Sequence, residues 1–104
     1  MKVSVIGVGL IGGSFALAIK ESFPESTIFG IDKSEAHVKE ALEIGFIDAA
    51  GTMEDLADSD VAIVAVPVDI SIKVLKEALD NAGDHTLVID AGSTKFKLCE
   101  AVKD

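Results

Sequence analysis

Three glycines and one acid near the start of the chain have the types and the spacing of groups that bind phosphate and ribose. Gly7, Gly9 and Gly12 form a G-x-G-x-x-G motif, and Asp32 lies about 20 residues beyond it. In this motif the first glycine permits a tight turn, the second lets a pyrophosphate lie against the backbone, and the third lets a helix pack closely on a strand. The phosphates then meet free N–H groups at the positive end of a helix dipole. The motif therefore predicts a dinucleotide site that needs no lysine.

The carboxylate of Asp32 is expected to select the nucleotide. Two hydroxyls of an adenine ribose can donate hydrogen bonds to it, whereas a 2′-phosphate is repelled, so the spacing favours NAD over NADP. The adjacent Lys33 is a cation that could soften this repulsion. A helix-capping or turn role for Asp32 is the alternative interpretation.

The apolar stretch 5–19 that carries the glycines also has the outline of a targeting segment. It follows Lys2, as the apolar part of a signal peptide follows a basic residue. Its glycines each weaken a helix by about 1 kcal/mol relative to alanine. The stretch is also shorter than the ~20 residues that cross a bilayer. The sequence therefore favours a phosphate-binding loop over a membrane or signal segment.

Strands and helices alternate along the whole chain and must position these groups. The expected strands are 2–6, 27–31, 46–47 with the residues that follow, 61–66 and 86–90. The expected helices are 11–22, a helix between Ser34 and Gly45, a short one opened by a capping box at Thr52–Asp55, a helix between the cap Asp69 and Gly83, and one from about Thr94 to the end. In the helix 11–22, the expected apolar positions are Phe15, Leu17, Ala18 and Ile19.

Such alternation predicts one domain, a parallel sheet with right-handed crossovers and helices on both faces. With about five strands in the order 3-2-1-4-5, ligands bind in the crevice between strands one and four, beyond their carboxyl ends. Val66–Pro67 ends strand four and Gly92–Ser93 follows strand five, so both would join the glycine loop along one rim. Alternatively, Pro67 only terminates a strand and Ser93 only caps the last helix.

Composition limits the classes of partner. The 104 residues carry 9 basic and 18 acidic side chains, a formal charge of −9, which argues against nucleic acid and anionic membranes. Cys99 is the single cysteine, so no internal disulfide forms, and an unpaired thiol suits a reducing cytoplasm. No His/Cys cluster indicates a metal site.

Four segments, GVGLIGGSFALAIK, GIDKS, DVAIVAVPV and IDAGSTK, resemble the N-terminal nucleotide-binding domain of the prephenate dehydrogenase family, which includes arogenate dehydrogenases. The resemblance covers essentially the whole chain. It implies a Rossmann-type three-layer α/β/α fold and NAD(P)-dependent oxidative decarboxylation of prephenate to 4-hydroxyphenylpyruvate, on the route to tyrosine. Hydride leaves the ring carbon that bears the hydroxyl, and loss of CO2 makes the ring aromatic.

The resemblance also implies a set of cofactor-binding positions. They are Gly7, Gly9, Leu10, Ile11, Gly12, Asp32, Val66, Pro67 and Ser93. The three motif glycines would hold the pyrophosphate, Asp32 the adenine ribose, and Val66 with Pro67 the nicotinamide side. Ser93 would lie near the nicotinamide and the substrate hydroxyl, in a supporting catalytic role.

Two features of the family are expected to be missing from residues 1–104: a sixth strand whose Gly-His-Pro run supplies the acid–base histidine, and a helical domain that completes the substrate pocket and the dimer. Neither His85, at the amino end of strand five, nor His37, in the second helix near solvent, is placed to replace that histidine. The chain has no arginine to clamp a dicarboxylate, and Cys99 is expected to be a core thiol in the last helix. We therefore expect a domain or fragment that is catalytically incomplete alone.

Other functions share these motifs. A non-catalytic nucleotide-binding or sensing module is one alternative, and the cofactor domain of a hydroxy-acid or imine reductase is another. Residues 86–90 form an apolar strand that would be an exposed edge, so a homodimer paired through this edge is possible unless the last helix covers it.

Overall fold

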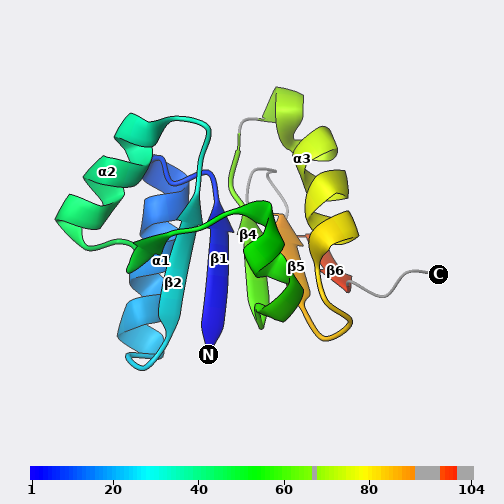
Figure 1. The fold of residues 1–104 in the computed structure, drawn as a ribbon, viewed down its shortest axis with the longest axis horizontal. Coiled ribbons are helices and arrows are strands. Elements are labelled where there is room, and N and C mark those ends of the chain that lie inside the picture. Colours follow the sequence, from blue (N-terminus) through cyan, green and yellow to red (C-terminus); the bar gives the residue numbers. More distant parts are fainter. Residues whose placement is uncertain (67, 91–96, 101–104) are drawn as a thin grey trace.

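A six-stranded sheet in the order β3-β2-β1-β4-β5-β6 runs through the computed structural model, which describes residues 1–66, 68–90 and 97–100. Its strands are β1 (Lys2–Ile6), β2 (Thr27–Ile31), β3 (Ala49–Ala50), β4 (Val61–Val64), β5 (Leu87–Asp90) and β6 (Lys97–Glu100). The helices are α1 (Leu10–Ser22), α2 (Glu35–Ile44), the 3-10 helix η1 (Met53–Asp58) and α3 (Val68–Asn81). The first five strands are parallel, which confirms the expected order 3-2-1-4-5 (Figure 1).

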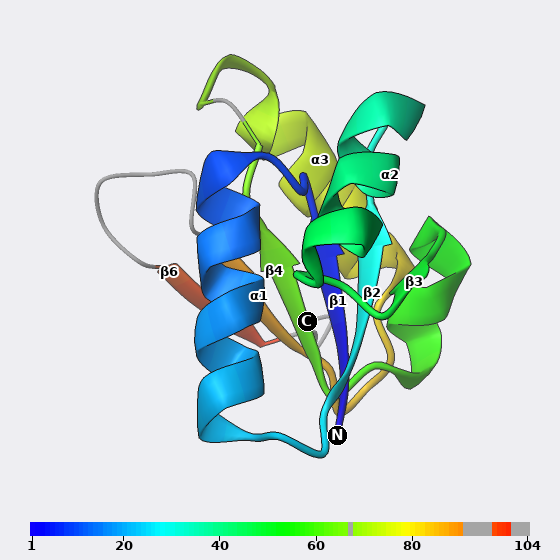
Figure 2. The same cartoon turned by 90° about the vertical axis from the view of Figure 1, so that its left-hand side faces the viewer.

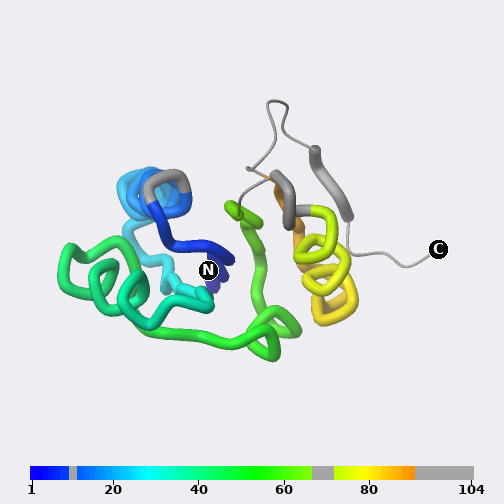
Figure 3. The backbone as a smooth tube through the Cα atoms, turned by 90° about the horizontal axis from the view of Figure 1, so that it is seen from above, coloured from blue at the N-terminus to red at the C-terminus, as the bar shows by residue number. Residues whose placement is uncertain are grey.

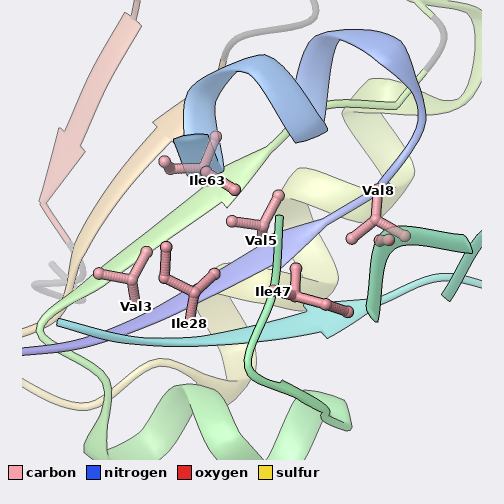
Figure 4. Packing of buried hydrophobic residues seen from close by; sticks show 8 residues of the cluster. Val3, Val5, Val8, Ile28, Ile47 and Ile63 are labelled. Atoms are coloured by element: carbon pink, nitrogen blue, oxygen red, sulfur yellow. The ribbon is translucent and has the colours of Figure 1, made fainter. Parts of the chain in front are cut away.

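Apolar side chains on the two faces of the sheet form two cores. The first core lies under α1 and α2 and contains Val3, Val5, Val8, Ala16, Ile28, Ala41, Ile47 and Ile63 (Figure 4). The second core lies under η1 and α3 and contains Ile6, Leu56, Ala62, Val64, Ala78 and Val88. Figure 2 faces the layer of α1 and α2, and Figure 3 shows these helices and α3 on opposite sides of the strands. The period-two alternation of each strand thus fills a core on both faces, as three-layer folds require.

The last residues of four neighbouring strands stand in register across the sheet. Ile6 of β1 pairs with Ile31 of β2 and with Val64 of β4, and Val64 pairs with Asp90 of β5. Because these four strands are parallel, they all end at one edge of the sheet, the upper edge in Figure 1. The glycine motif and Asp32 are therefore brought to the same edge.

The end of the chain differs from the sequence-based expectation. Residues 97–100 form β6, which pairs antiparallel with β5, where a helix from about Thr94 was expected. Pairing satisfies the N–H and C=O groups that β5 would otherwise leave free at the edge. Cys99 stands opposite Val88 in this ladder and not in a helix. Strand β5 is therefore not an edge of the sheet, which contradicts the expectation that two copies could pair through residues 86–90.

The local signals around α2 and η1 are confirmed. Ser34 caps α2 and its side chain accepts a hydrogen bond from the backbone of His37. Gly45 ends the helix with a φ of 95°, a conformation that favours glycine. At the start of η1, Asp55 Oδ2 accepts from the backbone N–H of Thr52 at 2.7 Å. The third strand is shorter than expected and follows Phe46–Ile47, at Ala49–Ala50.

Helix α1 faces the sheet with smaller residues than expected. Ala16 is fully buried, whereas Leu17, 43% exposed, and Ala18 face outward. Gly12, Ala16 and Ile19 lie at helical spacing on the sheet side, so the small side chains of the first two let the helix approach β1 closely. The apolar positions at Leu17 and Ala18 were therefore assigned to the wrong face.

The amino end of the sheet is closed by polar contacts between buried groups. Ser4 Oγ lies 2.7 Å from Ser59 Oγ, and Ser59 Oγ donates to the Asp55 carbonyl at 2.7 Å. Thr86 Oγ1 in turn donates to the Ser59 carbonyl at 2.7 Å. Buried hydroxyls without partners would cost free energy, so this chain of bonds fixes η1 to β1 and β5.

Backbone hydrogen bonds and ion pairs at the same end of the sheet lower the pKa values of two carboxyls, Asp55 and Asp48. The Thr52 N–H bond lowers the pKa of Asp55; burial opposes this shift, and Lys2 Nζ at 3.3 Å reinforces it. Burial opposes ionisation of Asp48, but Lys20 Nζ at 2.6 Å and the Ile28 N–H at 2.8 Å outweigh it and hold the pKa of Asp48 below its usual value.

Among the described residues, none of the helices is both long enough and apolar enough to span a membrane. Within the same part of the chain, no group of three or more metal-ligating side chains gathers that could hold an ion.

Candidate nucleotide-binding site

Gly7 makes the turn that leaves β1. Its φ is +91°, a backbone conformation that other residues adopt only with strain. Its N–H donates to the carbonyl of Ile31 at 2.7 Å, which ties the turn to the end of β2. A Cβ at this position would stand 2.5 Å from the Ala65 carbonyl oxygen and 3.0 Å from a methyl carbon of Val66. The turn after β1 thus packs against the segment after β4.

Gly12 and Gly13 bring the first turns of α1 against the rest of the molecule. A Cβ on Gly12 would stand 1.8 Å from the Gly7 carbonyl oxygen, so no larger residue fits there without movement of the backbone. A Cβ on Gly13 would meet the ring of Phe46 at 2.7 Å. In this motif the third glycine is the residue that allows the helix to pack closely on the strand.

Gly9 differs from its neighbours because its missing side chain faces open space. A Cβ built there has no neighbouring atom within 4 Å. Gly9 is also the N-cap of α1, so it offers no side chain to the first N–H groups of the helix, and the first turn holds no acidic residue. These N–H groups have no acceptor within the helix. An anion such as a diphosphate fits this arrangement, since the backbone is accessible and the helix dipole favours negative charge.

Asp32 holds the loop and the start of α2 together. Its Oδ2 accepts from the backbone N–H of Val8 at 3.0 Å, and its Oδ1 accepts from the backbone N–H of Ser34 at 2.9 Å. Its side chain is only 14% exposed. The carboxylate is therefore fixed beside the glycine loop, at the place where a ribose bound next to the diphosphate would present its hydroxyls.

His37 adds a further contact to this carboxylate. Its Nδ1 lies 3.3 Å from Asp32 Oδ2, and its ring is 56% exposed. The expectation that His37 lies near solvent is confirmed, but its contact with the ribose-binding candidate was missed. The signal was present in the spacing: His37 is the third residue after the cap Ser34, and a side chain at this position commonly reaches back over the helix start.

The structure describes some of the remaining expected site residues and not others. Val66 is half-buried and lies beside Gly7, so the loops after β1 and β4 meet as expected. Leu10 and Ile11 form the first turn of α1. Pro67 and Ser93 lie outside the described residues. His85 is exposed just before β5, at the opposite edge from the glycine loop, which agrees with its exclusion from the site.

The strand order, the glycine turn and the fixed carboxylate define the class of protein: a Rossmann-type nucleotide-binding domain. Residues 15–104 match the model of the prephenate dehydrogenase nucleotide-binding domain, and the chain belongs to this family.

Two prephenate dehydrogenases illustrate the relationship. That of Lactococcus lactis subsp. cremoris (strain MG1363) is 39% identical over 101 residues, which cover 95% of this chain and 28% of that protein. That of Bacillus subtilis (strain 168) is also 39% identical over 101 residues, which cover 94% of this chain and 27% of that protein. The chain therefore spans less than a third of the length of these relatives.

A solved structure has the same fold. The prephenate dehydrogenase from A. aeolicus in complex with hydroxyphenyl propionate and NAD+ superposes with a TM-score of 0.79 at 28% sequence identity. The match covers 91% of this chain and 34% of that one. The similarity thus includes nearly all of the sheet and helices that form the candidate site.

Proposed function

We propose that this chain is the NAD(H)-binding domain of an enzyme that oxidises and decarboxylates prephenate to 4-hydroxyphenylpyruvate. Membership of the prephenate dehydrogenase family supports the reaction. The observation that carries the cofactor assignment is the bond from the Val8 N–H to Asp32 Oδ2 at 3.0 Å. It joins the phosphate-binding loop to the candidate ribose-binding carboxylate in one rigid unit.

Different groups of this chain bind different parts of the cofactor. The N–H groups at the start of α1 hold the diphosphate, and Gly9 leaves the space that it needs. Residues 3–19, which contain the glycine loop and most of α1, carry no charged side chain of their own. Val66, beside Gly7, lines the side of the nicotinamide, with Pro67 and Ser93 as further family positions. When bound, the nicotinamide supplies the hydride acceptor.

Asp32 makes the site prefer NAD over NADP. Its carboxylate accepts hydrogen bonds from ribose hydroxyls, and its charge repels a 2′-phosphate, which carries about −1.5 to −2 charges near pH 7. Because the side chain is only 14% exposed, solvent screens this repulsion less than at an open surface.

We expect conversion of prephenate to need acid–base and substrate-binding groups that residues 1–104 do not supply. The sequence contains no arginine, and of its two histidines His85 lies at the far edge of the sheet and His37 contacts Asp32. General acid–base groups typically contribute about 10²–10⁴-fold to a rate. We propose that residues 1–104 alone bind nucleotide without converting prephenate, and that the full-length enzyme completes the site.

Titration of the purified chain with NADH and with NADPH tests the cofactor assignment. We expect tighter binding of NADH, and a smaller difference between the two nucleotides in Asp32→Asn. Asp84→Asn, an exposed acid between α3 and β5, is the matched control and should change neither affinity. Equal affinities in the wild-type chain would contradict the assignment.

Activity assays on the full-length enzyme test the substrate. Prephenate, arogenate and simple hydroxy acids are each supplied with NAD, and NADH absorbance is followed. We expect turnover with prephenate by the full-length enzyme and none by residues 1–104. Turnover of hydroxy acids alone would favour the reductase alternative, and robust turnover by residues 1–104 would show that the chemistry lies within them.

A further inference from the structure

His37 is held in place at the edge of the candidate ribose site by two contacts. Its backbone N–H donates to Ser34 Oγ at 3.3 Å, and its Nδ1 lies 3.3 Å from Asp32 Oδ2. A carboxylate only accepts hydrogen bonds, so Nδ1 is the donor in this contact whether the ring is neutral or charged. The imidazole therefore donates to the same oxygen that receives the Val8 N–H.

The hydrogen-bonding capacity of Asp32 is largely used before any nucleotide binds. A carboxylate offers about four acceptor positions. Three protein donors address them: the N–H groups of Val8 and Ser34 and the ring of His37. Two ribose hydroxyls cannot both be accepted at full strength while the imidazole stays. Of the three donors, the exposed ring is the one that can turn away, since the other two belong to the backbone.

The strands under helix α2 place no charge against this imidazole. Helix α2 packs on β2 and β3, and neither strand carries a titratable side chain. Its charged neighbours in sequence are Lys33 and Glu40, at helical spacing, and Glu35 and Lys39, which lie two positions away and so on other faces of the helix. Among the described residues, Asp32 is the one charged group that the ring contacts within 4 Å.

We propose that His37 is a specificity-determining residue for the 2′ position of the adenosine ribose. It competes with ribose hydroxyls for Asp32 and offsets the carboxylate charge that repels a 2′-phosphate. His37 thereby narrows the preference for NAD over NADP. This role rests on the proposed function, because it acts through the carboxylate assigned to the ribose.

The test is the ratio of the dissociation constants of NADPH and NADH for the wild-type chain and His37→Ala. We expect the ratio to rise roughly fivefold in the variant, about what one hydrogen bond contributes. NADPH should bind more weakly, and NADH equally or more tightly. Lys39→Ala is the matched control: it lies on the same helix, two residues along and hence on another face, and should leave the ratio unchanged.

A second measurement separates this role from a merely structural one. In the Asp32→Asn background, His37→Ala should leave the ratio unchanged, because the partner through which it acts is neutral. His37→Gln, which keeps a donor, should restore much of the wild-type ratio. Because the ring is 56% exposed, these variants should fold, and urea unfolding checks this.

The outcomes are distinct. An unchanged ratio in His37→Ala overturns the role of His37 while the nucleotide assignment stands. If His37→Ala raises the ratio equally in the wild-type and Asp32→Asn backgrounds, the effect does not depend on the Asp32 carboxylate. That result also overturns the proposed role of His37. Failure of the wild-type chain to bind either nucleotide overturns the proposed function itself.

Discussion

The backbone N–H of Val8 donates to Asp32 Oδ2 at 3.0 Å, so the loop after β1 and the residue after β2 form one connected unit. Val8 also belongs to the first core, and its Cγ1 would stand 2.8 Å from a Cβ on Gly30. The position of the candidate ribose carboxylate is therefore set by the packing of the sheet. Substitutions in this unit should affect binding and folding to different degrees, depending on what each side chain would meet.

Gly9→Val should weaken nucleotide binding with little loss of stability. The new side chain meets no neighbouring atom at its Cβ, so the fold accepts it, and the cost at a helix N-cap is about 1 kcal/mol or less. The same side chain would occupy the space proposed for the diphosphate. Calorimetric titration should show at least tenfold weaker binding of both NADH and NADPH. Unchanged affinity would place the diphosphate elsewhere.

Gly12→Ala should destabilise the fold itself. Its Cβ would stand 1.8 Å from the Gly7 carbonyl oxygen, and a backbone atom in a tight turn cannot move aside cheaply. We expect a loss of about 3 kcal/mol or more in the free energy of unfolding, at the upper end for overpacking. Urea denaturation measures it, with Gly9→Ala as the control. Equal stability of the two variants would mean that α1 does not pack on β1 as closely as described.

Ser59→Ala should cost about 1–3 kcal/mol in the free energy of unfolding. It removes the partner of the fully buried Ser4 hydroxyl and the donor to the Asp55 carbonyl. The double variant with Ser4→Ala should lose less than the sum of the two single losses, because it removes both members of the pair. Strict additivity in chemical denaturation would indicate that the two hydroxyls do not interact.

Stability should fall in acid partly because of Asp55. The Thr52 N–H and Lys2 lower its pKa in the folded state below the reference value of 3.8, so the unfolded chain binds the proton more readily. This contribution is complete above the unfolded pKa and is lost as the pH falls through the folded pKa. Asp55→Asn should therefore be less stable than wild type near pH 7 and show a flatter decline below about pH 4. Thermal unfolding from pH 7 to pH 2 measures this, with the exposed neighbour changed in Glu54→Gln as the control.

Local sequence signals predicted the central elements well because their physical causes are local. The β-branched run of β4, the cap at Ser34 and the positive φ at Gly45 depend on residues within a few positions. The strand order followed from the alternation of strands and helices together with the handedness of their connections. The glycine spacing predicted which position would be open and which would be filled, and Gly9 and Gly12 behave accordingly.

The errors fall where distant residues decide the structure. Residues 97–100 form a strand because β5 presents an unpaired edge, which no short-range pattern records. On α1, Leu17 is more apolar than Ala16, yet Ala16 faces the sheet since the close approach at Gly12 leaves little room there. His37 has an ordinary sequence context, and its contact with Asp32 depends on how α2 starts relative to the end of β2.

Strand β1 lies at the centre of the sheet, with β2 on one side and β4 on the other. Val3 pairs with Ile28 on one side and with Val61 on the other, so the ladder between β1 and β4 joins residues that are 58 positions apart in the sequence. Closing such loops costs chain entropy before their contacts form, and domains dominated by distant pairings fold more slowly than helical ones. The amides of β1 and β4 should accordingly exchange with solvent only through global opening, and the ladder between these strands should set the folding rate.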